Sequence, residues 1–124
     1  MYYEVHGEPQ PGRAPLMLIH GGGSTIESNF NELIPLLAET RQVIAVEEEG
    51  RGRTQPIDGA LTAEYSADDV AAVLRHLDDP SVDVLGFSAG GHTALALAMA
   101  HPSSVRRLII ASSFYKRDAM VEGF

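Results

Sequence analysis

The chain has 124 residues, about the length of one typical domain, with 44% hydrophobic and 21% charged residues. This composition is that of an ordinary globular sequence, and no apolar run approaches the roughly 20 residues that a membrane helix needs. The formal net charge of -8 argues against nucleic-acid binding, and the absence of cysteine excludes disulfides, a thiolate nucleophile and a cysteine-ligated metal.

The first segments of the chain are two apolar runs separated by a turn. Residues 1–4 lack the basic start and apolar core of a signal peptide, so we expect a cytoplasmic protein. Residues 2–6 are β-prone, and residues 7–15 are rich in Gly and Pro, as turns are. The run LMLI at residues 16–19 is apolar without alternation, which is typical of a strand covered on both faces. It leads directly into HGGG at residues 20–23.

The middle of the chain predicts two helices and a second covered strand. A helix is expected at residues 29–38, although Pro35 is compatible with it only near the first turn. Residues 42–46 form the strand, and the polar, Gly-punctuated residues 47–63 are expected to be a loop. Ser66 then resembles an N-cap, with Asp69 completing a capping box. The amphipathic stripe of that helix consists of Val70, Val73, Leu74 and Leu77, and Asp79-Pro80 ends it.

The last segments continue the alternation of strands and helices. Residues 82–87 are expected to be a strand, 89–100 a deeply packed helix that ends at His101-Pro102, and 108–111 a final strand covered on both faces. Strands of this kind alternating with helices predict an α/β fold, a parallel sheet flanked by helices, in a single domain over residues 1–124. The apolar residues 108–111 suit an interior strand of that sheet.

The stretch LGFSAGG at residues 85–91 places Ser88 at a strand-to-helix junction. A turn this tight strains the central residue and presses its neighbours against strand and helix, which only glycine permits at positions 86 and 90. Such a turn holds the Ser88 Oγ above the carboxyl end of the sheet, where α/β folds bind ligands. We interpret Ser88 as a nucleophile. The alternative is a turn of small residues that serves packing alone.

The HGGG stretch also follows a covered strand, and its glycines allow backbone N–H groups to approach a substrate oxygen. Together with the N–H of Ala89, they could bind the oxyanion that forms when Ser88 attacks an ester. The alternative is a flexible turn. His20 is a candidate for a catalytic base, but a histidine before such glycines more often holds the loop in shape through hydrogen bonds.

Five segments together resemble the α/β-hydrolases, of the compact esterase, lactonase and carbon–carbon hydrolase kind. In order, these segments are LMLIHGGG, QVIAVEEEGRGRT, YSADDVAAVLRHL, VDVLGFSAGGHTALALAMAHP and VRRLIIASS. The resemblance implies Ser88 as nucleophile, with Gly22, Gly23 and Ala89 as oxyanion donors, and it implies no cofactor and no metal. A serine at the elbow argues against epoxide hydrolases and dehalogenases, which have an aspartate there. Arg51 departs from the family, since many relatives have a histidine at that position.

A larger departure concerns the acid and the base, which in this family follow the nucleophile in the chain. His92 lies one turn into the elbow helix, and His101 lies at its far end, about 20 Å away at 1.5 Å per residue. Neither is expected to take a proton from Ser88, and His6 and His76 are expected to be structural or solvated. Asp118 has the right charge for the acid, but no histidine follows it in this sequence. It also lies where the family inserts its cap. We therefore expect the N-terminal half of a hydrolase, truncated before the cap and the last strands, with acid and histidine supplied by a complementary C-terminal chain or a swapped copy.

Three functional hypotheses follow from these features. The first is a serine hydrolase that cleaves small carboxylic esters or lactones through an acyl-enzyme and that is nearly inactive without its missing part. The second is a non-catalytic binding or scaffold module that uses the same pocket. The third is carbon–carbon bond hydrolysis or a haloperoxidase-like activity. Nucleotide binding is disfavoured because neither GxxxxGK[ST] nor GxGxxG occurs.

Overall fold

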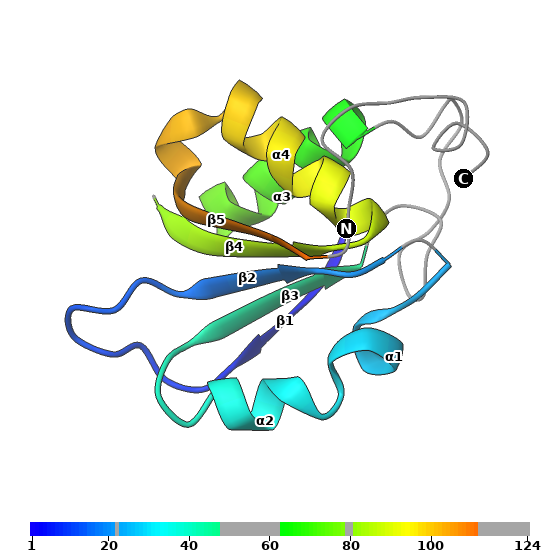
Figure 1. Cartoon of the computed structure of the whole chain (residues 1–124). Coiled ribbons are helices and arrows are strands. Elements are labelled where there is room, and N and C mark those ends of the chain that lie inside the picture. Colours follow the sequence, from blue (N-terminus) through cyan, green and yellow to red (C-terminus); the bar gives the residue numbers. More distant parts are fainter. Residues whose placement is uncertain (22, 48–62, 79–80, 112–124) are drawn as a thin grey trace.

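The computed structural model describes residues 1–21, 23–47, 63–78 and 81–111, which form a sheet with helices on both faces (Figure 1). The strands are β1 (Tyr2–His6), β2 (Leu16–Ile19), β3 (Val43–Glu47), β4 (Val82–Phe87) and β5 (Val105–Ala111). The helices are α1 (Ile26–Phe30), α2 (Leu33–Leu37), α3 (Ala63–His76) and α4 (Ala89–Ala100), and a 3₁₀ turn at Pro102–Ser104 follows α4.

The sheet has the strand order β1-β3-β2-β4-β5. Strands β3, β2, β4 and β5 are parallel, whereas β1 pairs with β3 in the antiparallel direction. The predicted α/β class and the helix-flanked sheet are confirmed. The sheet is not parallel throughout, because it carries the antiparallel edge strand that is common on such sheets.

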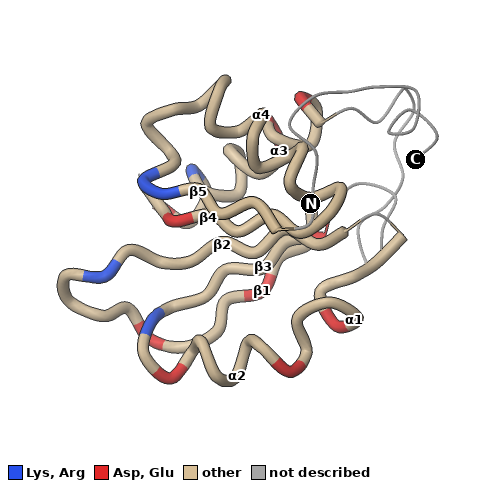
Figure 2. Tube along the Cα trace, in the orientation of Figure 1, with Lys and Arg blue, Asp and Glu red and all other residues tan. Residues whose placement is uncertain are grey.

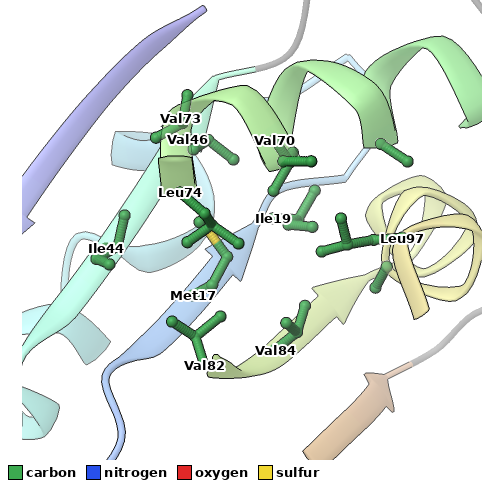
Figure 3. Close-up of a cluster of buried hydrophobic side chains, with 13 residues drawn as sticks. Met17, Ile19, Ile44, Val46, Val70, Val73, Leu74, Val82, Val84 and Leu97 are labelled. Carbon is green, nitrogen blue, oxygen red and sulfur yellow. The ribbon is translucent and has the colours of Figure 1, made fainter. Parts of the chain in front are cut away.

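The strands are uniformly apolar because the side chains of alternating residues enter two different cores, as the sequence predicts. Met17 and Ile19 of β2 pack against α3 and α4 in the larger cluster (Figure 3). Leu16 and Leu18 point the other way and pack with Phe30 of α1 in the second cluster. All four β2 residues are buried, and burying a side chain of this size contributes about 1.5–3 kcal/mol.

The helix expected at residues 29–38 is wrong in its bounds and its continuity. The chain forms the two short helices α1 and α2, and α1 starts earlier because Thr25 and Ser28 form a reciprocal capping box. Pro35 is the third residue of α2, so its missing N–H lies in the first turn, where no intrahelical partner is needed.

Three other predicted boundaries also differ from the structure. Ser66 is not an N-cap, because α3 already runs from Ala63 and buries Ser66 within it. The second covered strand extends to Glu47, a buried carboxylate that was expected to begin a loop. The last strand begins at Val105 rather than at residue 108.

Strand β5 is the last in the order of the described strands rather than an interior one. Ile109 and Ile110 are 50% and 38% exposed and, as neighbours in a strand, face opposite sides of the sheet. Apolar side chains on both faces of this strand therefore lack cover, and the unpaired backbone of an edge strand invites pairing with further chain.

Asp83 forms a charged cluster at the amino ends of the parallel strands. Its carboxylate accepts from Arg106 Nη2 at 2.8 Å, from Arg106 Nε at 3.0 Å and from Arg41 Nη2 at 2.9 Å. The described arginines gather at this end of the sheet, opposite the Ser88 junction (Figure 2). Burial raises the pKa of Asp83, but the hydrogen bonds and charges of Arg106 and Arg41 outweigh it and hold the pKa below its usual value.

We expect D83N to lower the free energy of unfolding by about 2 kcal/mol at pH 7. This loss is smaller than the usual cost of breaking a fully buried ion pair, because water reaches Arg106. Because the folded pKa is depressed, the contribution is complete above the unfolded pKa of about 3.9 and is lost as the pH falls through the folded pKa. Urea unfolding at pH 7 and pH 3 measures this difference in stability, with E39Q, at an exposed carboxylate, as the control. An unchanged wild-type-to-D83N difference at pH 3 would contradict the expectation.

Within the described ranges, no helix is both long and apolar enough to cross a membrane.

Candidate active site

Ser88 occupies a strained turn between β4 and α4. Its φ of 55° and ψ of -120° lie in a region that residues other than glycine rarely adopt. The backbone around it is held at both ends: Ser88 N–H donates to Ala111 O of β5 at 2.8 Å, and Gly91 N–H donates to Ser88 O at 2.9 Å. The sequence-based expectation of a tight, strained junction agrees with this geometry.

Gly86 and Gly90 make the turn possible because no space remains for a side chain. A Cβ added to Gly86 would lie 2.4 Å from Gly90 O and 2.8 Å from Ala94 Cβ. A Cβ added to Gly90 would lie 2.4 Å from both Ile19 O and His20 O. These distances are far below van der Waals contact, so the first turn of α4 packs directly on the backbone of β2 and β4.

The HGGG stretch reaches Ser88 because β2 and β4 are neighbours in register. Ile19 pairs with Gly86, so the residues that follow each strand emerge side by side at the carboxyl edge of the sheet. A Cβ added to Gly21 would lie 3.3 Å from Ser88 Cβ. The structure therefore places the start of the glycine loop against the serine, as the sequence predicts.

His20 is buried at the base of this loop, with 1% of its surface exposed. Its Nδ1 lies 2.7 Å from Gly21 O, a geometry in which the ring donates to the carbonyl. This contact agrees with the interpretation of His20 as a residue that holds the loop in shape.

The structure describes two of the three predicted oxyanion donors. Ala89 is the first residue of α4, where backbone N–H groups have no acceptor within the helix. Gly23 is exposed with a φ of +68°, a conformation that favours glycine. Gly22 lies outside the described residues, as do Arg51 and Asp118.

None of the five histidines forms a hydrogen bond with Ser88 Oγ among the residues that the structure describes. His101 Nε2 pairs with Asp68 Oδ1 of α3 at 2.8 Å, and His6 Nε2 pairs with Glu4 Oε1 at 2.9 Å. The His76 ring packs edge-on against Tyr3, and His92 is half-buried in α4. In the same described ranges, no group of three His, Asp or Glu side chains could hold a metal ion.

Two residues that hold the segment leading from the glycine loop into α1 were missed from the sequence. Asn29 Oδ1 accepts from Gly21 N–H at 2.7 Å, and Glu47 Oε2 accepts from Ile26 N–H at 3.4 Å at the start of α1. The sequence predicts Asn29 only as the first residue of a helix, and Glu47 only as the first residue of a loop. A signal for Glu47 existed, because a carboxylate directly after a covered strand lies at the carboxyl edge of the sheet.

A groove between β1 and the segment that carries α1 and α2 lies apart from this site. Glu4, His6, Thr25 and Glu47 are among its lining residues, and Ser88 and Gly21 are not. Around Ser88 the described residues supply a hydroxyl on a strained backbone, the N-terminus of α4 and the start of a glycine loop. This combination suits attack on a carbonyl and binding of the resulting oxyanion.

The comparisons with known proteins agree with this geometry. The family model for the alpha/beta hydrolase fold matches residues 14–123. The chain is 40% identical to 2-hydroxymuconate semialdehyde hydrolase of Pseudomonas sp. (strain CF600) over 112 residues, which cover 88% of this chain and 40% of the relative. It is 42% identical to the pimeloyl-[acyl-carrier protein] methyl ester esterase of Neisseria meningitidis serogroup C over 102 residues, 82% of this chain and 38% of the relative.

Among solved structures, an N-acyl homoserine lactone degrading enzyme superposes with a TM-score of 0.81 at 30% identity, covering 90% of this chain and 41% of that one. The chain thus spans about two fifths of the length of the curated relatives it matches. From the match over residues 14–123 and the hydrolase relatives, we conclude that this chain belongs to the α/β-hydrolase family.

Proposed function

We propose that the chain carries the nucleophile and oxyanion-binding part of a serine hydrolase that acts on small carboxylic esters or lactones. The observation that carries the proposal is the strained Ser88 at the β4–α4 junction, packed against the glycine loop that follows β2. The esterase and the lactone-degrading enzyme to which the chain is similar support this substrate class. The substrate itself is a small molecule, in a protein that we expect in the cytoplasm.

In the proposed reaction, Ser88 Oγ gives its proton to a histidine base and forms a bond to the carbonyl carbon. The N–H of Ala89 and those of the glycine loop, from Gly22 and Gly23, bind the negative oxygen. Collapse of the intermediate breaks the ester C–O bond, and the leaving alcohol takes the proton from the histidine. Water then releases the carboxylic acid from Ser88, so that one ester and one water give one alcohol and one acid.

The acid and the histidine come, in this proposal, from a complementary C-terminal chain or a swapped copy. The described histidines make other contacts, and the curated relatives are a little more than twice as long as this chain. The exposed Ile109 and Ile110 on edge strand β5 suit a surface that further chain covers.

The experiment compares the chain with a fusion in which it is followed by the part of the Pseudomonas relative beyond the matched segment. We expect the chain alone to hydrolyse p-nitrophenyl acetate about 10⁶-fold more slowly than the fusion, since loss of the base and acid costs that much while the oxyanion site keeps a residual rate. Equal rates for the two proteins would show that the described residues suffice and would contradict the proposal.

Hydrolysis of a carbon–carbon bond is the second candidate. The 40% identity to 2-hydroxymuconate semialdehyde hydrolase favours it. A panel of p-nitrophenyl esters, lactones and 2-hydroxymuconate semialdehyde, tested on the fusion and on the protein isolated from its source, separates the two candidates by their kcat/KM values.

A further inference from the structure

The backbone of Gly21 is held on both sides by side chains. Its N–H donates to Asn29 Oδ1 at 2.7 Å, and its carbonyl lies 2.7 Å from His20 Nδ1. Both hydrogen-bonding groups of this residue are therefore occupied, which leaves Gly21 no N–H for an oxyanion. Donors to the oxyanion must come from elsewhere in the loop or from Ala89.

Asn29 also lies close to the serine. A Cβ added to Gly21 would lie 3.4 Å from Asn29 Oδ1, 3.2 Å from Phe87 Cδ1 and 3.3 Å from Ser88 Cβ. Asn29 Oδ1 and Ser88 Cβ thus both border the small space beside the Gly21 Cα. A shift of the Gly21 backbone would change the distance between the glycine loop and Ser88.

The orientation of the Asn29 carboxamide follows from chemistry. A backbone N–H can only donate, so the atom that receives it must be Oδ1. Asn29 belongs to α1, whose first N–H groups are tied by the Thr25–Ser28 capping box and by Glu47. The side chain that holds Gly21 is in turn fixed by an anchored helix.

We propose that Asn29 is a positioning residue for the reaction, which acts by holding the Gly21 backbone, and with it the oxyanion loop, against Ser88. This inference rests on the proposed function, since positioning matters only if Ser88 attacks a carbonyl. The donor geometry is used in the transition state rather than in substrate binding, so Asn29 affects kcat more than KM.

The test uses three variants of the chain. N29L keeps the branching of asparagine with bulkier methyl groups and no acceptor, N29D keeps an oxygen acceptor at the same position, and N31L makes the same replacement at an exposed asparagine of the same segment. In NMR spectra of residues 1–124, N29L should speed hydrogen exchange of the Gly21 amide at least about 10-fold, because an amide released from its acceptor exchanges more readily. N29D and N31L should keep its protection. Equal Gly21 exchange in wild type and N29L would overturn the inference.

The functional readout is the division between kcat and KM in the enzyme completed by its C-terminal part. N29L should lower kcat roughly 10- to 100-fold with KM within about twofold, which is part of the loss seen when one oxyanion donor is removed. A kcat for N29L equal to wild type, in an enzyme that S88A inactivates, would overturn the role of Asn29 alone. Full activity of S88A would instead overturn the proposed function on which it rests.

Discussion

Replacing Ser88 with alanine is expected to lower kcat of the completed enzyme about 10⁶-fold, the loss that follows removal of a triad nucleophile. The reason is that no acyl bond can form without the hydroxyl, whereas binding and the oxyanion donors are retained. Ester hydrolysis by the fusion of this chain with the remaining part of the Pseudomonas relative measures the effect.

S103A serves as the matched control, because Ser103 is exposed on the 3₁₀ turn after α4 and far along the chain from the junction. Its kcat and its unfolding midpoint should equal those of wild type. Folded S88A protein with more than a tenth of the wild-type kcat would show that another group is the nucleophile.

The second large effect is expected for G90A. In most helices an alanine in place of glycine stabilises by up to about 1 kcal/mol. Here the added Cβ would lie 2.4 Å from the carbonyl oxygens of Ile19 and His20, so strand β2 or helix α4 must move. We expect the free energy of unfolding to fall by about 3 kcal/mol, at the upper end of overpacking effects.

The control for G90A is G12A, where nothing lies within 4 Å of the added Cβ but φ is +75°. Its cost should be about 1 kcal/mol, from the left-handed backbone alone. Urea unfolding followed by circular dichroism compares the two variants. If G90A proves as stable as wild type, the close packing of α4 on β2 is not a feature of the protein in solution.

The elements that the sequence predicts well are those in which local pattern and tertiary environment agree. The run LMLI is buried on both faces, and helix α4 has the predicted bounds because the Ser88 junction begins it and His101 ends it. The elbow itself was predictable, since few backbone conformations satisfy a glycine two residues before and two after a serine at such a junction.

The parts that escaped prediction depend on contacts between distant segments. The Thr25–Ser28 capping box starts α1, but the N–H of Ile26 also donates to Glu47, 21 residues later, and no local pattern encodes that second contact. The antiparallel direction of β1 depends on its pairing with β3 across about 40 residues. Asn29 was missed for the same reason, because its partner Gly21 belongs to a different element.

Covalent labelling of Ser88 tests the proposed nucleophile without any assumption about the substrate. The fusion and the chain alone are treated with a fluorophosphonate, and intact mass spectrometry followed by peptide mapping locates the adduct. We predict one adduct per fusion molecule, on Ser88, formed far faster than on the chain alone. An enzymatically active fusion that carries no adduct on Ser88, or carries it on another residue, would contradict the assignment of Ser88 as the nucleophile.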